Sequence, residues 1–64
     1  MKTIREYAVQ YIDRFGDACR ISENGRTKKY TLEEAREAAK QKRASSGRTT
    51  KICKGWTVIE VFEA

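Results

Sequence analysis

The chain has 64 residues, a formal net charge of +5, and 36% charged residues, and it contains no histidine. A chain this short buries only about 60% of its unfolded surface, so it holds one thin core and has no room for a deep catalytic cleft. Without a histidine base or a glycine-rich phosphate loop, the sequence predicts one non-enzymatic domain over residues 1–64 that uses no metal or other cofactor.

The two cysteines, Cys19 and Cys53, lie far apart and form no C-x-x-C motif. A zinc site would therefore lack its usual ligands. One disulfide is an open alternative, but reduced thiols in a cytosolic protein are favoured, because small disulfide-stapled domains usually carry four or more cysteines. The chain shows no signal peptide and no apolar run of membrane-spanning length, so we expect it in the cytoplasm of its host cell.

Residues 6–22 are predicted to form two strands joined by a turn. β-Favouring residues alternate through Tyr7, Val9 and Tyr11, turn-forming residues follow at 13–16, and Cys19 and Ile21 resume the alternation. These five residues are expected to face inward.

A tight hairpin is predicted at Asn24-Gly25, because both central residues of a type I′ turn need positive φ. A third short strand is expected through residues 26–30.

A helix is predicted to begin after Thr31, which forms a T-x-x-E capping box with Glu34. The apolar residues that follow share one face, so the helix should lay a narrow, mostly alanine stripe on the sheet. They are Leu32, Ala35, Ala38 and Ala39. The Ser-Ser-Gly sequence at 45–47 should end the helix.

The last turn of this helix is basic, which suits the negative end of the helix dipole. Lys42 falls within the alanine stripe, so either it reaches outward at the stripe's edge or the helix frays before it.

The chain should close with one strand from Trp56 to Phe62, preceded by a turn or bulge at Gly55. Alternation directs Trp56, Val58 and Phe62 to one face. Because Ile59 and Val61 make the other face apolar too, the strand is either central in the sheet, which is the favoured interpretation, or a surface for a partner. The predicted fold class is α+β: an antiparallel sheet of three to four strands on one helix, in the order ββ(β)αβ.

The positive charge is concentrated in the middle of the chain. Residues 26–51 carry nine basic and three acidic side chains, whereas the segments before and after are neutral or slightly acidic. This distribution favours contact with the phosphate backbone of DNA or RNA. The candidate nucleic-acid-binding residues are Lys28, Lys29, Lys40, Arg43, Arg48 and Lys51. They would form one patch if the third strand lay near the C-terminal end of the helix.

Residues 40–51 are rich in basic side chains. The helix dipole accounts for the positive charges up to Arg43. Arg48 and Lys51, beyond the predicted helix end, have no such local explanation. Exposed polar residues of the sheet, such as Gln10, Arg20 and Lys28, could in addition contact bases.

Protein binding is the alternative function. In that hypothesis the last strand and the basic surface dock on an acidic host protein, with Trp56 or Phe62 as the anchor. The same strand could also pair with a second copy of the chain.

Two family resemblances accompany these patterns. Residues 7–41, "YAVQYIDRFGDACRI" and "KKYTLEEAREAAKQ", resemble the arm-type DNA-binding domain of tyrosine integrases. That resemblance implies a three-stranded sheet, backed by a helix, that contacts the DNA major groove.

The segments "YTLEEAREAAKQ" and "KGWTVIEVFE" are similar in layout to the small phage inhibitor of host RNA polymerase typified by phage T7. This second resemblance implies docking on a host enzyme through surface charge and a sheet edge. Both resemblances imply a compact, non-catalytic accessory protein of a phage or mobile element.

Overall fold

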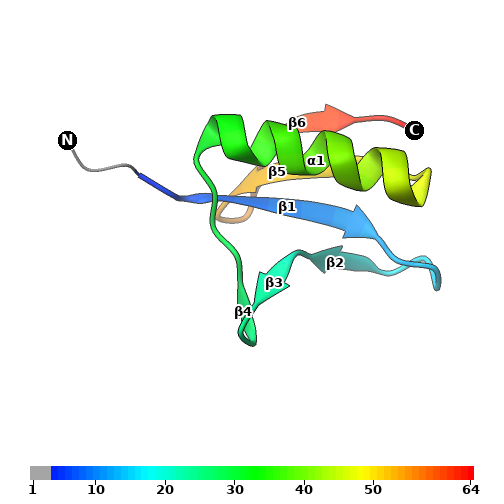
Figure 1. The fold of residues 1–64 in the computed structure, drawn as a ribbon, viewed down its shortest axis with the longest axis horizontal. Coiled ribbons are helices and arrows are strands. Elements are labelled where there is room, and N and C mark those ends of the chain that lie inside the picture. The colour runs from blue at the N-terminus through cyan, green and yellow to red at the C-terminus, as the bar shows by residue number, and fades with distance from the viewer. Residues whose placement is uncertain (1–3) are drawn as a thin grey trace.

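A computed structural model describes residues 4–64 and consists of one helix, one four-stranded sheet and one small hairpin (Figure 1). In chain order the elements are β1 (Tyr7–Ile12), β2 (Ala18–Arg20), β3 (Ser22–Glu23), β4 (Arg26–Thr27), α1 (Leu32–Ser46), β5 (Thr50–Lys54) and β6 (Thr57–Phe62).

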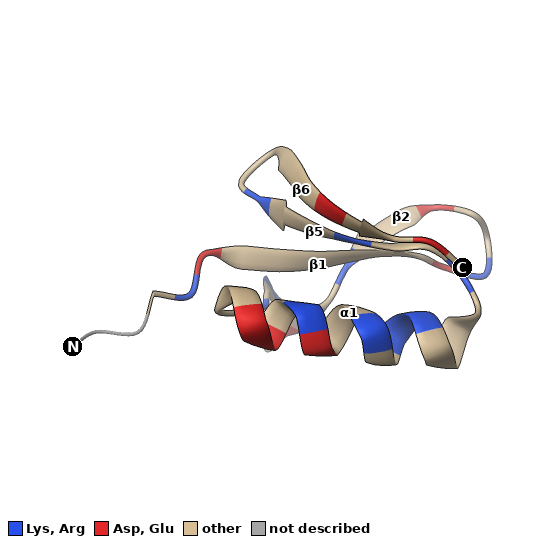
Figure 2. Ribbon diagram, turned by 90° about the horizontal axis from the view of Figure 1, so that it is seen from above, with Lys and Arg blue, Asp and Glu red and all other residues tan. Residues whose placement is uncertain are grey.

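The main sheet has the strand order β2-β1-β5-β6, and every neighbouring pair is antiparallel. Its centre is the pairing of β1 with β5, in which Val9 lies opposite Ile52. Helix α1 packs on one face of this sheet, against β1, β5 and part of β6 (Figure 2). The predicted α+β class, with one helix on a small antiparallel sheet, is confirmed.

The core lies between α1 and the two central strands. Ala35 and Ala39 are fully buried and pack against Val9 and Ile52, which confirms the predicted alanine stripe. Small side chains let the helix approach the sheet closely. Partly buried hydrophobic residues surround this centre: Tyr7, Ile21, Tyr30, Leu32, Ala38 and Phe62.

The helix begins and ends where the sequence predicts. The Glu34 amide donates to the Thr31 hydroxyl at 3.2 Å and the Thr31 amide donates to the Glu34 carboxylate at 3.0 Å, which completes the capping box. At the other end Gly47 adopts a left-handed conformation, with φ 69°, and donates its amide to the Arg43 carbonyl. No helix within residues 4–64 is long and apolar enough to cross a membrane.

The helix does not fray before Lys42, which was one of the two expectations for this residue. The helix continues past it, and its ammonium lies 4.2 Å from the centre of the Tyr11 ring. The aliphatic stem can thus lie along the sheet while the charge rests on an aromatic face.

The Asn24-Gly25 hairpin is confirmed, with φ 53° and 77° at its two central residues. The strand after it is only two residues long and pairs with β3 alone, so this hairpin forms a separate sheet.

The C-terminal region differs from the prediction. The structure has two strands there, joined by a turn at Gly55, and β5 takes the central position that the sequence favoured for the last strand. Strand β6 is instead an edge strand. Two lysines within β5, Lys51 and Lys54, obscured its pattern, and pairing partners distant in sequence decide which strand is central.

The expected faces of β6 are also wrong, because of an irregularity. The register shifts between Ile52 and Cys53, so that Ile52 pairs with Glu60 but Cys53 pairs with Val58. This bulge leaves Val58 and Val61 on the face opposite the helix, whereas Phe62 packs against the core beneath α1.

Loss of the capping box should weaken the fold measurably. We expect Thr31→Ala to lower the free energy of unfolding by about 1 kcal/mol, because the Glu34 amide loses its acceptor. Urea denaturation followed by circular dichroism measures the change. Thr31→Ser keeps a hydroxyl, so its free energy of unfolding should differ from that of the parent by about 0.3 kcal/mol or less. An equal loss of stability in both variants would contradict this role for the cap.

Candidate nucleic-acid interface

The six predicted basic residues do not form one patch. Lys28 and Lys29 follow the small hairpin and line a depression with Arg5 and the acidic first half of the helix. Lys28 also forms an ion pair with Glu23 at 3.4 Å. The basic residues were expected to form one patch if the third strand lay near the C-terminal end of the helix. Lys28 and Lys29 instead lie beside the N-terminal half of α1, so one patch does not form.

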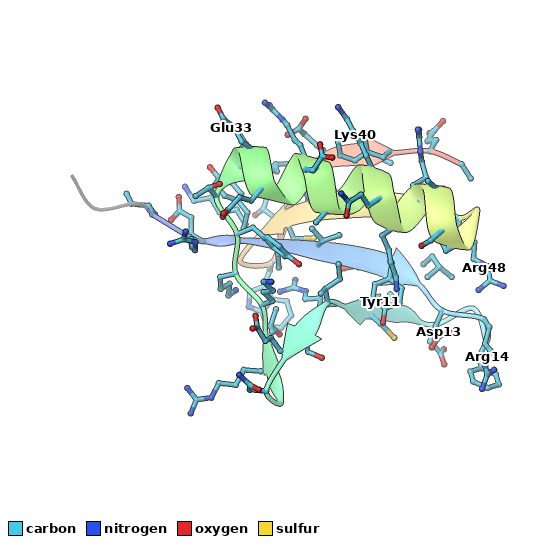
Figure 3. All side chains as sticks on the ribbon, in the orientation of Figure 1. Tyr11, Asp13, Arg14, Glu33, Lys40 and Arg48 are labelled. Carbon is cyan, nitrogen blue, oxygen red and sulfur yellow. The ribbon has the colours of Figure 1, made fainter. Side chains whose placement is uncertain are left out.

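The two predicted helix residues point elsewhere. Lys40 is exposed and projects from the side of α1 away from β1 (Figure 3). Arg43 donates to the main-chain carbonyl of Glu63 at 3.2 Å, so it ties the last turn of the helix to the end of β6.

Arg48 lies in an end cleft of about 450 Å³, formed where the β1–β2 turn meets the C-terminal end of α1 (Figure 3). The residues that line this end cleft are Tyr11, Ile12, Asp13, Arg14, Lys42, Ser46 and Arg48. Three of them are basic and one is acidic, so the end cleft is electropositive. The sequence prediction missed Arg14, which counted there only as a turn residue.

The single carboxylate of the end cleft is already engaged by the protein. Asp13 accepts hydrogen bonds at 2.9 Å from the amides of Asp17 and Phe15, and a weaker one from the Cys19 thiol. The Asp17 amide contributes most to holding the pKa of the Asp13 carboxyl below its usual value. Asp13 therefore stays charged and shapes the turn.

Lys51 lies on the other side of the sheet, on the face that α1 does not cover, which we call the open face. Val9 and Ile52 point to the helix, so their neighbours in β1 and β5 point away from it. Extending the registers to β2 and β6 gives the whole set: Ala8, Gln10, Ile12, Ala18, Arg20, Lys51, Cys53, Val58 and Val61.

A polar row crosses the open face. Gln10 pairs with Arg20 on one side and with Lys51 on the other, so three strands present these side chains next to one another. Both charged residues among the open-face positions are basic. At the rim, Glu6 forms an exposed ion pair with Lys54 at 3.2 Å.

Arg20 organises one end of the open face. Its guanidinium donates to the Gly55 carbonyl at 2.9 Å, so the side chain links edge strand β2 to the β5–β6 turn. It also lies 5.5 Å from the centre of the Trp56 ring. The crossing side chain helps explain why Ala8 and Cys53, on an uncovered face, are almost fully buried.

The two predicted protein-contact residues have different positions. Trp56 is 96% exposed in the β5–β6 turn, so it is not a core residue. Phe62 is partly buried and packs against the core, which leaves it unsuited to be an anchor. In addition to Trp56, three apolar residues of β6 are exposed: Val58, Ile59 and Val61.

The open face and the end cleft meet at Ile12, which belongs to both. Together they bring Arg20, Lys51, Arg48 and Arg14 onto adjoining surfaces. Among residues 4–64 there is no group of three or more cysteine, aspartate or glutamate side chains that could hold a metal ion.

No protein-family model matches the chain, and no curated protein or solved structure is significantly similar to it.

The Cys19 thiol provides a test of the end-cleft geometry. Its hydrogen bond to Asp13 is the main reason why the pKa of this thiol is raised. We therefore expect Cys19 to react slowly with iodoacetamide at pH 8, because only the thiolate is nucleophilic. Asp13→Asn should accelerate alkylation while its side-chain oxygen keeps the turn, and mass spectrometry reports the site. Buried Cys53 serves as an internal unreactive control; equal rates in parent and variant would show that Asp13 does not act on Cys19.

Proposed function

We propose that the protein is a small, non-catalytic nucleic-acid-binding accessory protein that contacts its ligand with the open face and the adjoining end cleft. The observation that carries this proposal is the row Arg20, Gln10 and Lys51 on an uncovered sheet face that has no acidic residue among its positions. Arginine and lysine commonly contact phosphates and guanine, and glutamine is among the side chains that contact adenine.

The charges around this row support the same proposal. Arg14 and Arg48 extend the positive surface at one end, and the one carboxylate near them is held by main-chain amides. A polyanion laid along the face would thus meet cations without having to displace ion pairs. The resemblance of residues 7–41 to a DNA-binding sheet of phage and mobile-element integrases is in keeping with this proposal.

Matched charge removals test which surface binds. Lys51→Gln with Arg48→Gln removes two charges from the proposed surface, and Lys29→Gln with Lys40→Gln removes two from elsewhere. If two phosphate contacts are lost, the slope of log K against log salt should fall by about 1.4 to 1.8 in the first pair. The control pair should leave it nearly unchanged. Anisotropy of a labelled oligonucleotide at several KCl concentrations gives both slopes.

The proposal would be wrong if the parent protein bound neither DNA nor RNA at low salt. An equal loss in both pairs would mean that net charge alone, and not this surface, accounts for binding. Circular dichroism of each variant shows that the fold is retained.

Protein binding through β6 is the second candidate, and one observation favours it. Val58, Ile59 and Val61 are 45%, 40% and 49% exposed on an edge strand, whose outer main-chain groups have no neighbouring strand within residues 4–64. Such an edge can accept a strand from a partner or from a second copy. The bulge in β6 works against this pairing, since bulges commonly protect sheet edges.

A lysine at Ile59, which is not among the open-face positions, separates the two functions. If β6 is a docking edge, Ile59→Lys should abolish association with a second copy, or with a protein captured from host lysate, and should leave the fold intact because the side chain is 40% exposed. Analytical ultracentrifugation and affinity capture measure this. Thr57→Lys, at the start of the same strand, is the control for added charge. A monomeric parent protein that captures nothing would count against the second candidate.

A further inference from the structure

We infer that the nucleic acid bound by the open face is single-stranded and that one of its bases stacks on Trp56. The inference rests on the proposed function and specifies the ligand of the same surface. It depends on the width of the sheet, on the position of the indole and on the charges beside it.

The sheet is too wide for the major groove of a duplex. Four strands spaced about 4.8 Å apart span about 14 Å between the outer backbones, before any side chain is added. The major groove of B-DNA is about 12 Å wide, which admits a helix or a two-stranded ribbon. Because the polar row spans β2, β1 and β5, and β6 lies beyond it, the face cannot enter the groove as a whole. An unpaired strand can lie flat on it.

Trp56 has the geometry of a stacking platform. Its ring is 96% exposed, and one side lies near the Arg20 guanidinium, 5.5 Å from the ring centre. Arg20 is itself anchored to the Gly55 carbonyl, next to Trp56 in the chain. This leaves an indole face free for a base, which would then lie in a stack with the ring and the guanidinium.

The surroundings of Trp56 suit the rest of a nucleotide chain. Lys51 and Arg20 supply positive charge for phosphates on the same face, and Val58 and Val61 offer apolar contacts for bases. Unpaired bases present such apolar faces, whereas a duplex hides them within its stack. A second exposed aromatic ring, Phe15, follows the other end of β1 and lies 5.1 Å from the Arg14 guanidinium. An arginine–aromatic pair therefore lies near each end of β1.

The chain carries one tryptophan, so its fluorescence reports directly on this site. The protein is titrated at low salt with a 12-nucleotide thymidine oligomer, with an abasic oligomer of equal length and with a 12-base-pair duplex. We expect saturable quenching with the thymidine oligomer. The abasic strand, which has the phosphates but no bases, should bind at least about 5-fold more weakly and quench little.

Two variants test the indole itself by anisotropy of labelled thymidine oligomer. Trp56→Ala should weaken binding by about 5- to 150-fold, the range found for loss of one base–aromatic stack, and Trp56→Phe should restore part of it. Because the side chain is almost fully exposed, neither change should alter the far-ultraviolet circular dichroism. Phe15→Ala, which removes the exposed ring of the second arginine–aromatic pair, should weaken binding less than Trp56→Ala.

The outcomes separate this inference from the proposed function. Tighter binding to the duplex, without quenching, would overturn the single-strand inference and leave nucleic-acid binding intact. Equal affinity for the abasic and thymidine strands, or an unchanged affinity of Trp56→Ala, would overturn stacking. No binding to any of the three oligonucleotides would remove the proposed function as well.

Discussion

The close contact between one alanine-lined helix and the two central strands is the constraint on which the rest of the structure depends. Ala35 and Ala39 sit directly on Val9 and Ile52, and these four residues form the centre of the buried core. Residues 4–64 form one helix, and one helix covers one face of the sheet. The other face of the sheet must therefore meet water or a ligand, which makes its composition the most informative part of the molecule.

The open face shows how a small protein keeps an uncovered sheet stable. Ala8 and Cys53 are protected although no helix lies over them, and the Arg20 side chain that crosses nearby supplies part of that cover. The same arginine holds its charge beside an exposed indole. Arg20 thus contributes to the fold and also belongs to the proposed binding surface, so removing it would affect both, and Lys51 is the cleaner probe of charge alone.

Local features could be predicted from the sequence, and long-range pairing could not. The capping box at Thr31 and the Asn24-Gly25 turn depend on residues four apart or fewer, so the sequence contains all that determines them. Of the polar residues expected on the sheet surface, Gln10 and Arg20 lie on the sheet and are half-buried, whereas Lys28 lies outside the strands. The position of β6 at the edge, its bulge and the separation of Lys29 from Arg48 depend on strand pairing between distant segments, which side-chain alternation does not encode.

The pairing of β1 with β5 has a consequence for how the protein folds. The hairpins β1–β2 and β5–β6 are local, but the central pair joins residues 7–11 to residues 50–54, at opposite ends of the chain. Closing a loop of this length costs chain entropy before the helix can pack on the paired strands. The hairpins can therefore form early, whereas the core beneath α1 assembles only when β5 pairs with β1, which couples the two hairpins in folding.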